Sequence, residues 1–169
     1  MAVMPQLFCT EEEKFREIEP VRNTKFTKPE GGLWTSTYTP DKKFPSAWVE
    51  WCAYEMPEWL EDVNFFLLVP RDDANVYVID SYKDLEHLYK RFGISNEFGF
   101  TIMDWEEIAK EYDAVMLTEA GEISTRFSTP LSLHGWDCES TLWFRDVFES
   151  VKRIKIKYKY DIFSFLEVK

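Results

Sequence analysis

Apolar positions recur every three or four residues in three segments of the chain, which is the spacing of an amphipathic helix. The segments are 47–56, 82–92 and 105–112. Each follows a residue that can cap a helix N-terminus: Ser46, Ser81 and Asp104. The pattern therefore predicts about three helices.

Short runs rich in β-branched and aromatic residues predict strands. They cover 15–21, 33–38, 64–69, 76–80, 114–117, the last residues of 134–144, and 154–160. The runs 64–69 and 76–80 flank a Pro-Arg-Asp-Asp turn, which favours a hairpin or two adjacent strands. Because strands and helices do not alternate regularly, we expect an α+β fold with a mostly antiparallel sheet.

The length of 169 residues suits one domain with a substantial core, so we expect 1–169 to form a single domain. Residues 1–13 contain Pro5 and three consecutive glutamates, and are expected to be a loosely ordered lead-in. Hydrophobic residues make up 45% of the chain and aromatic residues 17%, which excludes a disordered or fibrous class.

The formal net charge of −11 makes this an acidic protein and disfavours non-specific nucleic-acid binding, which requires clustered lysine and arginine. The exception is the segment 152–159, which contains five basic residues and no acidic one. That segment is either a binding surface or an edge strand protected by its lysines.

The three cysteines, Cys9, Cys52 and Cys138, are far apart and form no CxxC pair. With no recognisable signal peptide, this usage predicts a reducing, cytoplasmic location. No apolar run approaches the length of a membrane span. Two histidines and unpaired cysteines are too few for a structural zinc site, so no metal is expected, although carboxylates alone could form an oxygen-only site.

The first candidate site is the stretch Lys28-Pro-Glu-Gly-Gly-Leu-Trp-Thr-Ser36. Gly31 and Gly32 can adopt positive φ, and their N–H groups could then face a ligand lined by Trp34, Thr35 and Ser36. The alternative is a tight turn before a strand, which a glycine pair supports at least as well.

The second candidate is Trp136-Asp-Cys-Glu-Ser-Thr141. Asp137 and Glu139 lie on one face if this segment is extended, and such carboxylates can orient a ribose hydroxyl or stabilise a cationic transition state. The alternative is that Asp137 bonds turn amides while Glu139 lies in solvent. The flanking acids disfavour a thiolate at Cys138.

Trp34, Trp48 and Trp51 could form an aromatic wall against nicotinamide or a base, with core packing as the default.

The chain resembles a group of small bacterial and phage proteins in four motifs taken together: KPxGGLWTS, Ser46-Ala-Trp-Val-Glu-Trp-Cys52, Tyr112-Asp-Ala-Val and GWDCES. More distantly, the arrangement is similar to the ADP-ribosyltransferase-like fold. That resemblance implies NAD as the cofactor, Thr35 and Ser36 on the second element, Glu139 as the late acid, and Arg22 or Arg16 as the early basic residue.

Two functional hypotheses follow. In an NAD-using ADP-ribosyltransferase-like enzyme, Glu139 would hold a ribose hydroxyl while Thr35 or Ser36 fixes the nicotinamide amide. The expected ligand-binding residues are Arg22, Lys28, Gly31, Gly32, Trp34, Trp51 and Asp137. The alternative is a non-catalytic phage or mobile-element protein that sequesters a nucleotide or inhibits a host protein, because an acidic surface can occupy a basic one.

Overall fold

The computed structural model describes residues 3–156, and these form two compact units. The described residues of unit 1 fall within 1–16, 35–74 and 147–169, and unit 2 comprises 17–34 and 75–146. The chain therefore passes between the units four times, and neither unit is a continuous stretch of sequence.

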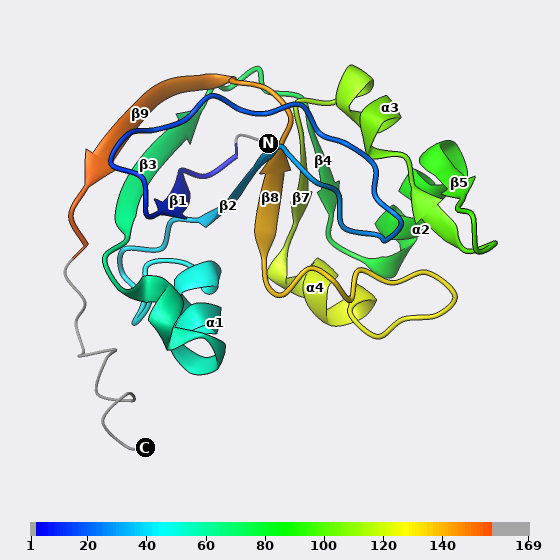
Figure 1. The fold of residues 1–169 in the computed structure, drawn as a ribbon, viewed down its shortest axis with the longest axis horizontal. Helices are drawn as coiled ribbons and strands as arrows, with labels where there is room; N and C mark the ends of the chain where they lie inside the picture. The colour runs from blue at the N-terminus through cyan, green and yellow to red at the C-terminus, as the bar shows by residue number, and fades with distance from the viewer. Residues whose placement is uncertain (1–2, 157–169) are drawn as a thin grey trace. The chain divides into compact units, whose positions relative to one another are not determined.

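Unit 1 contains an antiparallel sheet in the order β2-β1-β3-β9 (Figure 1). The strands are β1 (Gln6–Thr10), β2 (Leu33–Thr37), β3 (Asn64–Pro70) and β9 (Phe148–Ile154). Strand β2 straddles the boundary, since its first two residues belong to unit 2. Leu7, Phe65 and Ile154 project from three of these strands into one hydrophobic cluster.

The helix α1 (Ala47–Glu55) contributes Val49 and Cys52 to the same cluster, and both side chains are fully buried. The side chain of Ser46 caps α1 by accepting a hydrogen bond from the Val49 N–H at 3.2 Å. A short 3-10 helix, η1 (Pro57–Leu60), follows directly. Proline at its first position suits a helix start, because that N–H has no helical partner.

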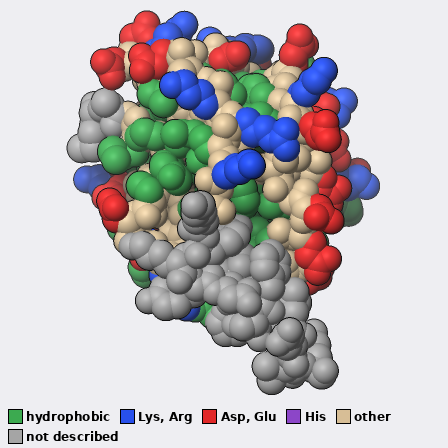
Figure 2. Space-filling model, turned by 90° about the vertical axis from the view of Figure 1, so that its left-hand side faces the viewer, with side chains coloured by type: hydrophobic (Ala, Val, Ile, Leu, Met, Phe, Trp, Pro, Cys, Tyr) green, Lys and Arg blue, Asp and Glu red, His purple; other side chains and the backbone are tan. Residues whose placement is uncertain are grey.

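Strand β9 lies at one end of the strand order and carries exposed basic side chains at Lys152 and Arg153, followed by Lys155. Figure 2 views the structure from the side where β9 lies in Figure 1, and basic side chains appear there among hydrophobic ones. The strand predicted over 154–160 is shifted: β9 runs from Phe148 to Ile154, so the two ranges share only Ile154. Residues 157–160 lie outside the described part of the chain.

Unit 2 contains β4 (Val76–Ile79), β7 (Ala114–Leu117) and β8 (Ser140–Trp143). Strand β7 pairs in parallel with β4 and antiparallel with β8. A separate antiparallel pair joins β5 (Gly93–Ser95) and β6 (Thr101–Met103). The described strands are therefore mostly antiparallel, and the class is α+β as predicted.

Three helices pack in unit 2: α2 (Tyr82–Phe92), α3 (Trp105–Glu111) and α4 (Glu119–Thr125). Ser81, Asp104 and Thr118 cap them, each accepting a backbone N–H hydrogen bond from three residues ahead. Leu85, Leu88 and Ile108 are fully buried in the core of the unit, as their helical spacing predicts. Among the described residues no helix is long and apolar enough to cross a bilayer.

Several predictions need correction. Residues 15–21 form no strand, because Phe15 packs against Phe8 and Phe66 in unit 1 whereas Val21 enters the core of unit 2.

The runs 64–69 and 76–80 do not pair with each other but belong to different units. Strand β3 pairs with β1 and β9, and β4 pairs with β7. The described residues form four α-helices, with α4 unpredicted, and β1 lies within the expected lead-in.

Candidate functional site

Both glycines of the first candidate stretch have positive φ, +74° at Gly31 and +67° at Gly32. A Cβ on Gly31 would lie 2.2 Å from the carbonyl oxygen of Pro20, so another residue would collide with backbone there. The Gly32 N–H donates a hydrogen bond to the Glu19 carbonyl at 2.9 Å. The turn geometry and these contacts account for the glycine pair without a ligand.

Thr35 and Ser36 are buried in unit 1, where their hydroxyls serve local contacts. The Thr35 hydroxyl donates to the side-chain oxygen of Gln6 at 2.8 Å, linking β2 to β1. The Ser36 hydroxyl accepts a hydrogen bond from the Trp48 N–H at 3.2 Å, at the first turn of α1. The two hydroxyls therefore connect β2 to β1 and to α1, respectively.

In unit 2 the two candidate stretches meet at Lys28, Trp34 and Asp137, which we call the Lys28 cluster. The Lys28 Nζ lies 3.5 Å from the Asp137 carboxylate and 4.8 Å from the centre of the Trp34 ring. The side chains of Lys28 and Asp137 are 43% and 35% exposed, so a ligand could reach both. All three residues are predicted from the sequence, whereas the pairing between them is seen only in the structure.

Trp136 and Trp105 pack next to the Lys28 cluster, and neither is predicted as a site residue from the sequence. The Trp136 ring meets the Trp34 ring edge-on with centroids 4.7 Å apart, and stacks on Trp105 at 5.7 Å. The Trp105 indole N–H donates to the Thr27 carbonyl at 2.8 Å, which fixes the loop that carries Lys28. The signal for Trp136 was its position beside Asp137 in the second candidate stretch.

Glu139 directly precedes β8 and is only 9% exposed. The expected alternative of a glutamate in solvent is therefore wrong. Asp137 two residues earlier is more open and turns toward Lys28. The two carboxylates thus occupy different environments, one nearly buried and one accessible.

Trp51 belongs to unit 1, where it forms a second aromatic group with Trp48 and Trp59. The rings of Trp48 and Trp51 stack with centroids 5.2 Å apart and planes 14° from parallel. Trp59, from η1, lies 5.9 Å from both and is 49% exposed. We call these three residues the tryptophan surface. Trp59 lies beyond the predicted helix, so helical spacing did not reveal it.

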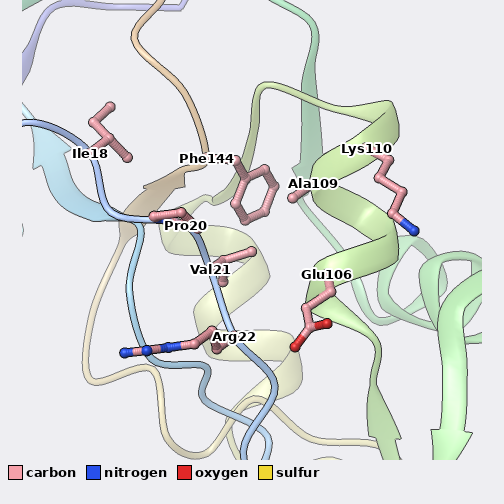
Figure 3. A pocket seen from close by; sticks show the side chains of 8 residues that line it. All are labelled: Ile18, Pro20, Val21, Arg22, Glu106, Ala109, Lys110 and Phe144. Atoms are coloured by element: carbon pink, nitrogen blue, oxygen red, sulfur yellow. The ribbon is translucent and has the colours of Figure 1, made fainter.

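Arg22 lines a shallow pocket of about 600 Å³ in unit 2 (Figure 3). Val21, Ala109 and Phe144 form its apolar floor, and Arg22 and Lys110 extend on opposite sides of it in the figure. The charges here already have partners. The Arg22 guanidinium lies 3.9 Å from Glu30, the Lys110 ammonium contacts Glu107, and the Glu106 carboxylate accepts the Asn23 N–H. Its basic groups are thus paired, as Lys28 is with Asp137, but the pocket lining contains no tryptophan that could stack on a flat ring.

The Lys28 cluster offers three kinds of recognition at once. An ammonium can pair with phosphate, a carboxylate can accept ribose hydroxyls, and an indole can stack on a flat ring. No group of three or more histidine, cysteine or acidic side chains arranged to hold a metal ion is found among residues 3–156.

Comparison with known proteins gives no match: no protein-family model, no curated protein sequence and no solved structure is similar to this chain.

Proposed function

We propose that the protein binds a nucleotide of the NAD class at the Lys28 cluster of unit 2. The observation that carries this proposal is the convergence of an accessible ammonium, an accessible carboxylate and an indole at Lys28, Asp137 and Trp34. A nucleotide supplies the complement of each group: a phosphate, ribose hydroxyls and a planar ring. The contact of Trp34 with Trp136 keeps its ring in place before the ligand arrives.

Nucleotide binding is tested by calorimetric titration of NAD, ADP-ribose and AMP, together with thermal unfolding. NAD at about 100 times its dissociation constant should stabilise the protein by about 2.7 kcal/mol. Absence of both heat and stabilisation for all three nucleotides would overturn the proposal.

The substitution Lys28→Met should weaken NAD binding about tenfold, because it removes a charge-assisted contact to phosphate. Lys25→Met is the matched control. Lys25 lies in the same loop and also has both an ion pair, with Glu97 at 3.3 Å, and an aromatic contact, with Phe98 at 6.0 Å. Binding should survive in the control, and an equal loss in both variants would argue against a site at Lys28.

A second candidate is transfer of ADP-ribose from NAD, which the nearly buried carboxylate of Glu139 favours. In that reaction the bond between the ribose and nicotinamide breaks, nicotinamide leaves, and a nucleophile of the target loses a proton as it bonds to the ribose carbon. A carboxylate held out of water stabilises the developing positive charge more strongly than a solvated one.

Incubation of the protein with labelled NAD and cell extract separates the two candidates. An enzyme should release nicotinamide, and Glu139→Gln should abolish the release while NAD still binds. Binding without release in the parent protein would identify a non-catalytic protein that sequesters the nucleotide. Release that persists undiminished in Glu139→Gln would remove Glu139 from the reaction.

A further inference from the structure

The tryptophan surface of unit 1 places aromatic rings at the protein exterior rather than in its core. Trp48 and Trp51 are partly buried against the hydrophobic cluster of unit 1, whereas Trp59 is 49% exposed. All three ring centroids lie within 5.9 Å of one another, so the rings form one continuous wall. A stacked, preorganised aromatic wall can bind a partner at little cost in side-chain entropy.

Acidic side chains surround this wall. Glu55 follows Trp48 and Trp51 by seven and four residues, which places it on the same face of α1. Glu58 and Glu61 flank Trp59 along the chain, and all three glutamates are exposed. None of them forms an ion pair with another residue in the described part of the protein.

Basic residues are absent from this part of the sequence, since residues 44–70 contain no lysine, arginine or histidine. The segment that carries the wall therefore has five acidic side chains and no basic one, although Lys43 lies 5.9 Å from the Tyr54 ring and Arg153 donates to Asn64. This excess of acidic groups favours ammonium and guanidinium over phosphate. Such cations also bind to the faces of indole rings. Charge and aromaticity thus favour the same kind of partner.

We infer that the tryptophan surface binds a basic segment of a partner protein, with arginine or lysine side chains on the indole faces and the flanking glutamates completing the charge pairs. This function is separate from the nucleotide proposal, because the surface lies in unit 1 and the Lys28 cluster in unit 2. Binding at the tryptophan surface would let this acidic protein occupy a basic surface of a target protein.

The probe is a short peptide of alternating arginine and glycine, titrated into the whole protein while tryptophan fluorescence is recorded. Binding should change the fluorescence and weaken as salt is added. Trp59→Ala should weaken it about fivefold, through the loss of cation-π contacts. Phe98→Ala, at an aromatic side chain 61% exposed in unit 2, is the matched control and should bind the peptide as the parent does.

A charge-matched pair of triple variants tests the acidic part of the inference. Replacing Glu55, Glu58 and Glu61 by glutamine should weaken peptide binding about tenfold, because each lost pair contributes modestly at an exposed site. The same replacement at Glu11, Glu12 and Glu13, which are also exposed in unit 1, changes the net charge equally and should have little effect. Equal losses in the two variants would indicate attraction to overall charge and overturn the inference.

Two further outcomes would also overturn it. One is peptide binding that is unaffected by both Trp59→Ala and the first triple variant. The other is preferential binding of the corresponding glutamate-glycine peptide or of a single-stranded oligonucleotide, either of which would show that the surface selects anions. Nucleotide binding, measured on the same variants, should remain at the parent level, so the two proposals can fail independently.

Discussion

At the scale of single residues, backbone geometry explains the glycine pair better than a ligand does. Gly31 packs against the Pro20 carbonyl, and a Cβ on Gly32 would lie 2.5 Å from the Leu142 side chain. A substitution at either position therefore lowers stability, and any loss of binding in that variant could come from the loss of stability. Gly32→Ala is consequently not a clean probe of the site, whereas Lys28 and Asp137 have accessible side chains that can be exchanged without moving the backbone.

Gly31→Ala should lower the free energy of unfolding by about 2–4 kcal/mol, because it combines left-handed backbone strain with a collision. Gly99→Ala is the matched control, since Gly99 has a similar φ of +77° but no atom within 4 Å of its hypothetical Cβ. The control should cost only about 1 kcal/mol. Urea denaturation measures both, and equal losses would show that contact with Pro20 contributes nothing.

At the scale of elements, prediction succeeded where one face of a segment is buried. The segment 82–92 places Leu85 and Leu88 inward and is helix α2 over the predicted range. Helix α4 escaped prediction because it lacks such a stripe: Ile123 is 73% exposed, and the helix instead approaches β4 through Gly121. A Cβ there would lie 2.0 Å from the Ile79 carbonyl, so this glycine reflects close packing rather than a turn.

For the candidate site, the sequence predicts which stretches are unusual but not that they contact each other. Composition singled out the stretches around Lys28 and Asp137, because glycine pairs and clustered acids depart from ordinary core or loop sequence. Their ion pair depends on tertiary packing between loops far apart in the chain, and a single sequence carries no local signal for that. Trp59 was missed because it follows Pro57, where the helical period stops.

The Thr118 cap at the start of α4 should contribute measurably to stability. The Thr118 hydroxyl accepts the Gly121 N–H at 3.0 Å and donates to the Asp80 carboxylate at 2.6 Å. Thr118→Ala should therefore lower the free energy of unfolding by about 1 kcal/mol. Thr118→Ser keeps the hydroxyl and should retain most of that stability in chemical denaturation. If serine proves as damaging as alanine, the methyl group rather than the cap supports the helix.

At the scale of the whole molecule, each unit contains an ionisable group whose titration is coupled to its folding, the half-buried Cys9 in unit 1 and the buried Tyr89 in unit 2. In unit 1, burial and the neighbouring Cys52 raise the pKa of the Cys9 thiol above its ordinary value of 9.0. In unit 2, burial raises the pKa of Tyr89 from 10.0 to about 12. A raised pKa means that the folded form holds the proton more tightly than the unfolded chain does.

With respect to these groups, stability should therefore be complete below pH 9. It should decline through Cys9 from pH 9 upward and, in addition, through Tyr89 between pH 10 and 12. Tyr89→Phe should flatten the decline between pH 10 and 12, and Cys9→Ala should flatten its onset. Urea midpoints measured at each pH give the curves. Tyr54→Phe, at a side chain 55% exposed, is the control. If Tyr54→Phe flattens the decline in stability as much as Tyr89→Phe does, the decline does not come from Tyr89.

The four passages of the chain between the units impose an order on folding during synthesis. Every strand and helix of unit 2 has left the ribosome once residue 146 is free, whereas β3 must wait for β9, its partner from Phe148 onward. Until then β3 presents the apolar run Phe65-Phe66-Leu67-Leu68 on an unpaired edge, which is the kind of segment that aggregates. A chain cut after residue 146 lacks β9 and leaves this edge unpaired, so it should give a lower yield of soluble protein than the full chain.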